Sequence, residues 1–289
     1  MKFGVIDREG KVTVPFKYEK IHPVFDHKYD KALFIVSEFG KNGVYNSEGK
    51  LIVPVKYTYI RTVEDQYIIA STDSETSIFS FSGELIQSID GKFKSVLAEI
   101  LIVEKNGLQG FYHYKSKNYC APKFEDIRFY NDTGTVVTNG ISRFINYKGE
   151  YIIRNSYRFA RDFINGVAIV GAYGGVKCIN GKGEELSKVY DEIGRFVDGL
   201  ALVKLNNKYG FIDMTGKEII PIQYSEAMQF GDGLAPVKIN DKWGYIDKTN
   251  KLVISAEYDT VSPFDKGYAR VSKNSKYFTI NTKNRIIER

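Results

Sequence analysis

Residues 242–254 read KWGYIDKTNKLVI, and this stretch decides the fold because most of the chain repeats it with substitutions. Trp243, Tyr245 and Ile246 favour a strand, and so does the run 252–254. Between them lies Asp-Lys-Thr-Asn, in which the Asp side chain can accept backbone hydrogen bonds and the Asn tolerates positive φ. The stretch therefore predicts a β-hairpin with a tight turn.

The hairpin recurs along the whole chain. Copies aligned on Gly244 place an equivalent residue at positions 4, 43, 77, 110, 143, 177, 210, 244 and 278, in steps of 33 or 34 residues after a first step of 39. The nine repeats begin near residues 2, 41, 75, 108, 141, 175, 208, 242 and 276. A fixed period of this length is typical of a repeat architecture. We expect a single repeat array over residues 1–289.

A second pattern follows several hairpins. Phe-x-x-Gly-Leu-Ala-x-Val, or a close variant, stands at residues 163–170, 196–203, 230–237 and 264–271. Its Gly indicates a turn, and its Ala and Val, two residues apart, lie on one face of a strand. No segment has apolar residues at helical spacing, and Gly and Pro recur too often for long helices. The sequence predicts an all-β chain whose hairpins are stable only when they stack.

Composition limits the class of protein. With 289 residues, 43% of them hydrophobic and 14% aromatic, the chain can bury a substantial core. It has no apolar run of about 18 residues that would predict a membrane span, and no signal-type segment as written. We expect a cytoplasmic protein, or a secreted or surface-anchored one if an upstream signal was removed. Cys120 and Cys178 occupy non-equivalent places in two repeats, so we interpret both as core residues.

The charge pattern bears on the class of partner. The net charge is +6, but positive and negative stretches alternate along the sequence. Nucleic-acid binders concentrate basic residues on one face or stripe. The alternation therefore argues against a nucleic-acid partner.

The repeats resemble the bacterial WG-repeat family, also called KWG repeats. The family's repeat runs approximately Trp-Gly-x-Ile-Asp, a turn Gly, Val-Ile-Pro, Tyr-Asp and Phe-x-x-Gly-Leu-Ala-x-Val, and residues 209–237 and 243–271 fit it best. The resemblance is strong in repeats 1, 2, 7 and 8 and weak in repeats 3, 4 and 6. It implies a β-repeat array that mediates interactions, with no catalytic residues to carry over and no cofactor.

Two architectures are compatible with stacked β-repeats: an open, curved β-array and a closed, propeller-like ring. A closed ring commonly joins its ends by completing one split sheet. Here the chain begins with a hairpin at Lys2 and finishes with a full hairpin over residues 276–287, so the ends duplicate each other. We therefore expect the open array, with the closed ring as the alternative.

Polar side chains recur at one turn position of the hairpins, where the residues are Asp7, Asn46, Asn146, Asn180, Asp213, Asp247 and Asn281. A row of carboxylates could suggest metal or catalytic sites. Alternation between Asp and Asn instead predicts acceptors for backbone hydrogen bonds. His113 stands at this position in the fourth repeat, and we interpret it as a substituted turn residue.

No catalytic or metal-binding pattern emerges from the sequence. His22, Asp26 and His27 could each ligate a metal, but they lack a fourth ligand and an established spacing. With only three histidines, no Ser-His-Asp or Cys-His arrangement can be nominated. We predict no catalytic, cofactor-binding or metal-binding residues, and a protein that is not an enzyme.

Aromatic and Arg residues outside the repeat pattern mark the predicted partner surface, because binding surfaces are enriched in Tyr and Arg. Such aromatics concentrate in the first four repeats. Three Arg residues in the fifth repeat, interleaved with Tyr157 and Phe159, could hold an acidic peptide, a glycan or a nucleic-acid backbone. The candidate partner-binding residues are Tyr59, Tyr67, Tyr114, Tyr119, Phe129, Tyr130, Arg154, Arg158 and Arg161.

The sequence thus predicts a non-enzymatic interaction module, a β-repeat scaffold that binds a protein or peptide partner. The alternative is a glycan-binding protein in which exposed aromatic rings stack on sugar faces.

Overall fold

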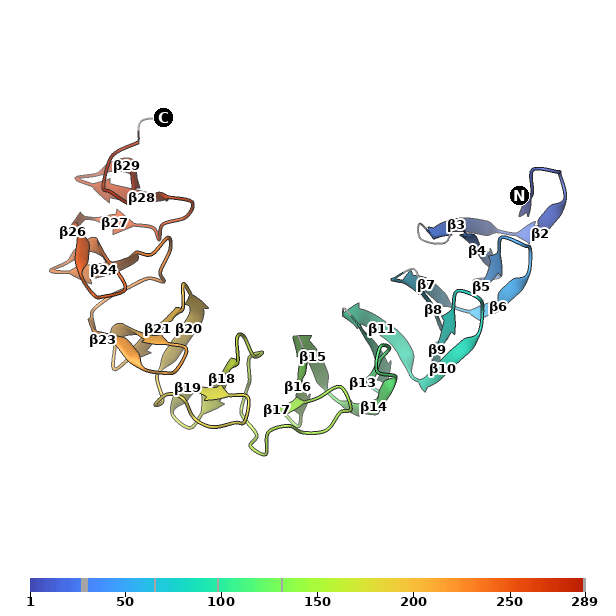
Figure 1. The fold of residues 1–289 in the computed structure, drawn as a ribbon, viewed down its shortest axis with the longest axis horizontal. Coiled ribbons are helices and arrows are strands. Elements are labelled where there is room, and N and C mark those ends of the chain that lie inside the picture. The colour runs from blue at the N-terminus through green and yellow to red at the C-terminus, as the bar shows by residue number, and fades with distance from the viewer. Residues whose placement is uncertain (27–30, 65, 98, 131, 288–289) are drawn as a thin grey trace. The chain divides into compact units, whose positions relative to one another are not determined.

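The computed structural model describes residues 1–26, 31–64, 66–97, 99–130 and 132–287. These residues form 29 strands and no helix, and the strands make nine small antiparallel sheets that follow one another in chain order (Figure 1). We number these sheets 1 to 9. The all-β class and the tandem arrangement of small sheets are confirmed. The open form of the array stays a prediction.

Sheets 1 to 4 contain β1 (Phe3–Ile6) and β2 (Val12–Tyr18); β3 (Lys20–Asp26), β4 (Lys31–Glu38), β5 (Lys41–Asn46) and β6 (Leu51–Tyr57); β7 (Tyr59–Val63), β8 (Tyr67–Ser71), β9 (Glu75–Ser80) and β10 (Leu85–Asp90); and β11 (Lys92–Leu97), β12 (Ile100–Lys105), β13 (Leu108–His113) and β14 (Asn118–Phe124).

Sheets 5 to 9 contain β15 (Asp126–Tyr130), β16 (Thr133–Thr138) and β17 (Ile141–Ile145); β18 (Val167–Ala172) and β19 (Gly175–Asn180); β20 (Glu192–Val197), β21 (Leu200–Leu205), β22 (Lys208–Asp213) and β23 (Glu218–Tyr224); β24 (Ala235–Ile239), β25 (Lys242–Ile246) and β26 (Leu252–Tyr258); and β27 (Thr260–Val261), β28 (Tyr268–Lys273) and β29 (Lys276–Asn281).

The chain divides into two compact units. The N-terminal unit comprises Met1–Phe129, Val136–Asn139 and Asn146–Glu150. The C-terminal unit comprises Tyr130–Thr135, Gly140–Ile145 and Tyr151–Arg289. A single array over residues 1–289 stays a prediction.

Each complete sheet takes its strands from two consecutive sequence repeats. In sheet 7, β20 and β21 belong to the sixth repeat, whereas β22 and β23 form the hairpin of the seventh. Asn206 and Asn207 join β21 to β22, and both have positive φ, as a two-residue hairpin turn requires. We call β22 and its equivalents the Trp-Gly strands, and β21 and its equivalents the third strands. The third strand of one repeat therefore pairs with the Trp-Gly strand of the next.

The glycine of the Trp-Gly strand is fixed by close backbone packing. A Cβ built on Gly244 would lie 2.6 Å from the carbonyl oxygen of Ile254 and 2.9 Å from Cα of Ala256, both on the neighbouring strand β26. Gly43 and Gly210 have equally short approaches to backbone atoms. Only glycine fits between these two strands without moving one of them.

The turn position acts as predicted. Oδ1 of Asp247 accepts the backbone N–H of Thr249 at 2.9 Å and of Lys251 at 3.0 Å. The same side-chain oxygen accepts backbone N–H groups at the six equivalent residues, which are Asp7, Asn46, Asn146, Asn180, Asp213 and Asn281. These carboxylates and amides close turns, and the interpretation as backbone acceptors is confirmed.

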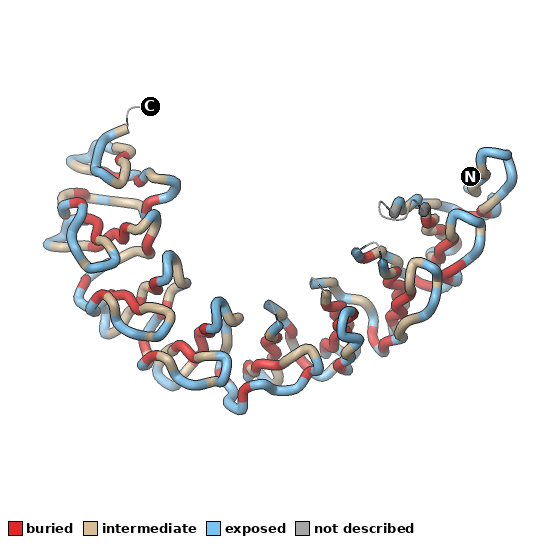
Figure 2. The backbone as a smooth tube through the Cα atoms, viewed as in Figure 1, coloured by how far each residue is buried: buried red, intermediate tan, exposed pale blue. Residues whose placement is uncertain are grey.

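Neighbouring sheets are joined by rings and by hydroxyl groups. In the C-terminal unit, the Tyr224 hydroxyl donates to Oδ1 of Asn250 in the next hairpin turn at 2.6 Å, and Tyr258 does the same to Asn284. Phe230 packs on Phe211 of the preceding sheet with ring centroids 4.8 Å apart. Figure 2 shows the resulting buried segments within each sheet. The aromatic residues that recur at repeat positions are buried or half-buried, and they are Tyr18, Tyr57, Tyr157, Tyr224, Tyr258, Phe163, Phe196, Phe230 and Phe264.

Both cysteines are core residues, as expected. They are buried and free, and burial raises the pKa of the Cys178 thiol to about 11 and also raises that of Cys120. In the described residues, no helix is long and apolar enough to cross a membrane.

The close approach at Gly244 predicts the effect of a single added methyl group. Gly244→Ala forces its Cβ into the backbone of β26 and should lower the free energy of unfolding by about 1–3 kcal/mol, the usual range for overpacking. Gly181→Ala is the matched control, because nothing lies within 4 Å of its added Cβ and its φ is not positive. Urea unfolding followed by circular dichroism measures both; equal stability of the two variants would contradict this account of the Trp-Gly glycine.

Asp247 predicts a pH-dependent contribution to stability. Hydrogen bonds from the Thr249 hydroxyl, and next from the Lys251 backbone N–H, hold the pKa of this carboxyl below its usual range. Its stabilisation is therefore present above the ordinary Asp pKa and is lost as pH falls through the folded pKa. Asp247→Asn should fold equally well at neutral pH and lose less stability on acidification. The reciprocal variant Asn46→Asp should gain acid sensitivity; parallel pH profiles of melting temperature for all three proteins would contradict the prediction.

Candidate functional site

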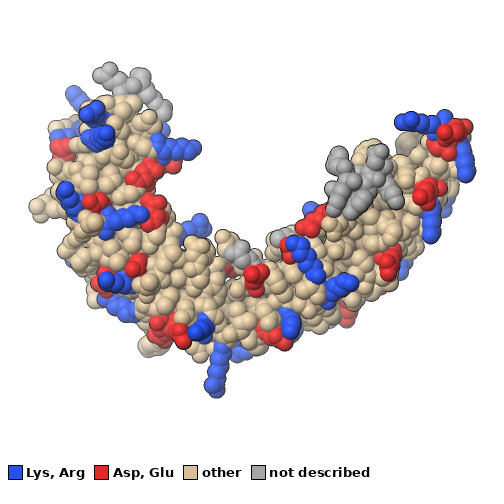
Figure 3. All heavy atoms as spheres, in the orientation of Figure 1, with Lys and Arg blue, Asp and Glu red and all other residues tan. Residues whose placement is uncertain are grey.

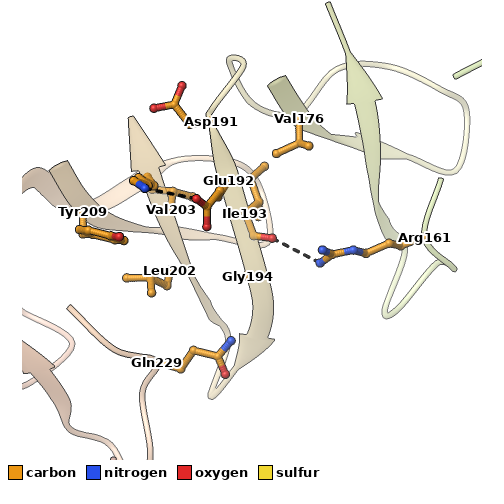
Figure 4. Close-up of a pocket in the computed structure, with 11 residues that line it drawn as sticks. Arg161, Val176, Asp191, Glu192, Ile193, Gly194, Leu202, Val203, Tyr209 and Gln229 are labelled. Carbon is orange, nitrogen blue, oxygen red and sulfur yellow. Dashed lines mark hydrogen bonds and ion pairs between the residues drawn. The ribbon is translucent and has the colours of Figure 1, made fainter. Parts of the chain in front are cut away.

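A hollow of about 370 Å³ opens in the C-terminal unit beside β20, the first strand of sheet 7 (Figure 4). Among the described residues β20 pairs only with β21, so its other edge is unpaired. Ligand pockets are commonly of this size or larger. The residues that line it are Arg161, Val176, Asp191, Glu192, Ile193, Gly194, Leu202, Val203, Lys204, Tyr209 and Gln229.

Gly194 creates the space. A Cβ built there would lie 3.1 Å from Nε2 of Gln229 and 3.4 Å from the carbonyl oxygen of Leu202. The register of β20 against β21 shifts between Ile193 and Phe196, as in a β-bulge. At the corresponding place on other sheets, the residue that follows the one facing the third strand is His22, Arg61, Lys94, Arg161, Met228 or Ser262. Sheet 7 therefore has a glycine where these sheets carry a side chain, which is large in all of them except sheet 9.

Two hydrogen-bond donors flank Gly194. Arg161 reaches toward β20 from the segment before β18, and its guanidinium donates to the carbonyl oxygen of Ile193 at 3.3 Å. Gln229 approaches from the segment after β23, on the other side of Gly194 (Figure 4). A guanidinium has five N–H donors, so most of those of Arg161 remain for a bound group.

The acidic residues of the hollow already have partners. Glu192 forms an ion pair with Lys204 at 3.3 Å, and this contact raises the pKa of the lysine. Asp191 accepts the backbone N–H of Asn206 at 2.8 Å. The donors of Arg161 and Gln229 thus face the hollow with little competition, and this arrangement suits a carboxylate or carbonyl oxygen of a ligand.

The structure separates the three arginines of the fifth repeat. Arg161 lines the hollow, whereas Arg154 and Arg158 are exposed and do not line it. Gly194 and Gln229 were not predicted from the sequence. A comparison of equivalent edge positions among the repeats could have found Gly194, because it is the glycine in a series of mostly large side chains. Nothing in the sequence brings Gln229 next to it.

The aromatic candidates come from different strands and differ in exposure. Tyr59 is partly exposed on β7 and stacks on Phe93 with centroids 4.8 Å apart, and Tyr119 is partly exposed on β14. Phe129 is half-buried against Phe111, with centroids 4.9 Å apart. Tyr130 is exposed and belongs to the C-terminal unit.

Tyr114 lies in the core rather than on the surface, where we expected it. Its ring packs with half-buried Tyr67, centroids 5.2 Å apart, and its hydroxyl donates to Oε1 of Glu64 at 3.0 Å. The ring that departs from the repeat pattern here fills space between sheets instead of facing a partner.

His113 occupies a turn, as predicted, although its neighbours resemble a catalytic chain. Its Nδ1 lies 2.6 Å from Oγ of Ser116 and accepts the Ser116 backbone N–H at 3.3 Å, while Nε2 lies 3.2 Å from Oε2 of Glu99. Because a backbone N–H can only donate, Nδ1 acts as the acceptor that Asp provides elsewhere. The ring is buried against Tyr147, with centroids 3.9 Å apart.

No group of three His, Cys, Asp or Glu residues in the described part of the chain could hold a metal ion. His27, one of the three residues considered as ligands in the first repeat, lies outside the described residues, and His22 is exposed.

Five stretches match the family described as WG containing repeat: residues 3–39, 43–74, 178–209, 209–243 and 243–277. These stretches correspond to repeats 1, 2, 6, 7 and 8. The sixth repeat, in which the resemblance looked weak, is therefore matched, and the match of the other four agrees with the sequence analysis. A comparison with curated proteins gives no match.

Several solved structures are similar to this chain at low identity. AztD from Citrobacter koseri has 13% identity and a TM-score of 0.37 over 92% of this chain and 93% of its own. Hsv2p from Kluyveromyces lactis has 9% identity and a TM-score of 0.35 over 75% of this chain and 89% of its own. The extracellular domain of the putative hybrid two component system BT4673 from B. thetaiotaomicron has 9% identity and a TM-score of 0.32, with 97% and 56% covered.

The matched stretches span more than half of the sequence, and they contain the hairpins β1–β2, β5–β6, β22–β23 and β25–β26 that build sheets 1, 2, 7 and 8. The chain therefore belongs to the WG containing repeat family.

Proposed function

We propose that the chain is a non-enzymatic interaction module that binds a polypeptide partner, and that the hollow beside Gly194 receives a carboxylate or carbonyl group of that partner. The observation that carries this proposal is the bare glycine between two donors, Arg161 and Gln229. A guanidinium matches the geometry of a carboxylate and can bind it through two parallel hydrogen bonds.

A polypeptide fits the surroundings of the hollow better than a small polar molecule alone. The edge of β20 that does not pair with β21 presents backbone groups. One of them, the carbonyl oxygen of Ile193, already accepts a hydrogen bond from Arg161. Tyr209 and Leu202 add apolar surface next to the donors. An extended segment could place one acidic or carbonyl group at Gly194 while the rest of it follows the edge of the sheet.

The chemistry of the hollow supports a role without catalysis. Its carboxylates are held in an ion pair with Lys204 and in a backbone hydrogen bond, and the lining contains no Ser, Cys or His that could act as a nucleophile or base. The groups left to act there are donors that bind.

Glycan and nucleic-acid partners have less support. The exposed rings expected to stack on sugars, Tyr59 and Tyr119, lie on different sheets of the N-terminal unit. On the face shown in Figure 3, Lys and Arg side chains are interspersed with Asp and Glu, unlike the single basic face of nucleic-acid binders.

Selection of binding peptides tests the proposal. A random peptide library is selected on the immobilised 289-residue chain, and affinities of the selected peptides are measured for three variants. Arg161→Ala removes the main donor and should weaken binding by about tenfold or more, the cost of a charged hydrogen bond. Gly194→Met should fill the hollow and weaken binding similarly, and it should fold because Met228 occupies the corresponding place.

Arg158→Ala is the matched control, because Arg158 is exposed in the same segment but does not line the hollow. We expect it to bind the selected peptides normally. Peptide binding that is unchanged by Arg161→Ala and Gly194→Met would overturn the site. Hits on a glycan array, with no peptide selected, would overturn the polypeptide partner.

A further inference from the structure

A large apolar side chain is exposed at the same place of three successive sheets in the N-terminal unit. Leu51, Leu85 and Tyr119 lie near the start of β6, β10 and β14, the last strands of sheets 2, 3 and 4, and each faces the residue that is equivalent to Ile246. Their relative exposures are 41%, 53% and 38%. Each of these sheets packs against a sheet on both sides, so the exposure belongs to the repeated position. We call the three residues the apolar column.

The fold does not require an apolar residue at this place. In sheets 6 and 7 of the C-terminal unit the equivalent residues are Glu185 and Glu218, which face Ile179 and Ile212, and both are exposed. The position thus accepts a carboxylate within the same pairing pattern. Apolar residues at this place in three successive sheets therefore indicate a role other than stabilising the hairpin.

Contacts between sheets bring neighbouring members of the column together. The turn of sheet 3 packs on the last strand of sheet 2, because a Cβ built on Gly83 would lie 2.5 Å from Cβ of Ile52. Ile52 follows Leu51, and Gly83 stands two residues before Leu85. Sheets 3 and 4 pack through a shared buried cluster. Packed sheets lie about 10 Å apart, and we expect this spacing between successive members of the column.

The spacing selects the shape of a partner that would cover the column. Seven residues of an α-helix rise about 10.5 Å and return to nearly the same face. Residues on one face of a strand are about 6.6 or 13 Å apart. A strand added to one edge would also follow a single sheet and reach a single member of the column. A helix that crosses the three sheets can place an apolar side chain at each member.

Lysine side chains flank the column. Lys56 on β6 and Lys123 on β14 are exposed, and their ammonium groups lie 5.0 and 5.1 Å from the ring centroids of Tyr57 and Phe124. Neither lysine forms an ion pair with another described residue. Acidic side chains beside the apolar face of a partner would therefore find unpaired cations here.

We propose that the apolar column is a docking site for an acidic amphipathic α-helix of a partner protein, with apolar residues one heptad apart. The helix covers Leu51, Leu85 and Tyr119 with its apolar face and directs carboxylates toward Lys56 and Lys123. A lipid surface suits the column less well, because about half of each apolar side chain is already buried in its own sheet. The site is separate from the hollow at Gly194 and does not depend on the function proposed there.

A stapled helical peptide is the probe. It has three heptads with Leu at every seventh residue, Glu on both sides of the Leu stripe and Ala elsewhere. Fluorescence anisotropy with the whole chain should show saturable binding. A control peptide of the same composition has Leu at every fifth residue, which places each Leu about 140° around the helix from the one before it. The control should bind about tenfold more weakly or worse.

Leu85→Glu tests the site in the protein. It introduces the residue that sheets 6 and 7 carry at this place, so it should fold, and it should weaken probe binding by about tenfold or more because docking would bury a charge. Leu252→Glu is the matched control, since Leu252 has the same place in sheet 8 and is 43% exposed, but belongs to the C-terminal unit. It should bind the probe normally. Thermal melting followed by circular dichroism checks the fold of both variants.

Four results would overturn the docking site: no binding of the probe, equal binding of the two peptides, unchanged binding to Leu85→Glu, or equal weakening by Leu252→Glu. A probe with Lys in place of every Glu should bind about tenfold more weakly, and equal binding would overturn the acidic partner. If the helical probe fails, while anionic phospholipid vesicles bind or the chain dimerises in a way that Leu85→Glu abolishes, the choice of a helix is overturned.

Arg161→Ala separates this site from the hollow and should bind the helical probe with normal affinity. Loss of probe binding in Arg161→Ala would overturn the assignment to the apolar column. If library peptides bind the hollow while the helical probe fails to bind, the docking helix is refuted and the proposed function is not.

Discussion

The structure depends on one constraint: a two-stranded hairpin does not bury enough surface to stay folded in water. From the second repeat onward, the Trp-Gly strand gains a third strand from the preceding repeat, and its sheet packs against a neighbouring sheet. The close approach of β25 and β26 at Gly244, and the hydroxyl bonds of Tyr224 and Tyr258 to the next hairpin turn, are consequences of this arrangement. Stability in such an array is a sum of terms between neighbours.

The offset between sequence repeats and sheets also determines where binding can occur. The third strand of one repeat completes the next sheet. The same arrangement leaves the first strand of a complete sheet with one neighbour. On β20 this free edge coincides with a glycine, and the hollow at Gly194 results. The hollow is therefore a departure from a regular pattern, at a place where the pattern supplies a side chain.

Much of the fold could be predicted from the sequence, because each repeat carries its local rules in its residues. The alternation of Asp and Asn at positions such as 46 and 247 identified turn acceptors, and the burial of Tyr258 and Phe264 follows from their place in the repeat. The pairing of third strands with the next repeat could not be predicted. The repeat length is the same whether a third strand pairs with the hairpin of its own repeat or with that of the next. The two-residue turns between third strands and the following Trp-Gly strands, such as Asn206–Asn207 and Asn240–Asp241, fix this pairing in the structure.

The sites were harder to predict than the fold, because a site depends on which repeats become neighbours. Arg161 was a candidate from composition alone, and it lines the hollow, but its partner Gln229 lies 68 positions later in the sequence. Tyr114 shows the opposite case. An aromatic residue outside the repeat pattern looked like a surface feature, yet its ring fills the core and its hydroxyl bonds to Glu64.

The most direct measurement of the central claim is hydrogen exchange in a chain shortened by residues 260–289, a deletion that removes β27, β28 and β29 of sheet 9. If sheets are stable only through their neighbours, the amides of Tyr245 and Ile246 in sheet 8 should exchange much faster, since the packing of Phe264 on Tyr245 and the bond from Tyr258 to Asn284 are removed. Amides of β12 and β13 in the N-terminal unit should keep their protection. Unchanged exchange in sheet 8 would show that each sheet is stable by itself, and would contradict the account.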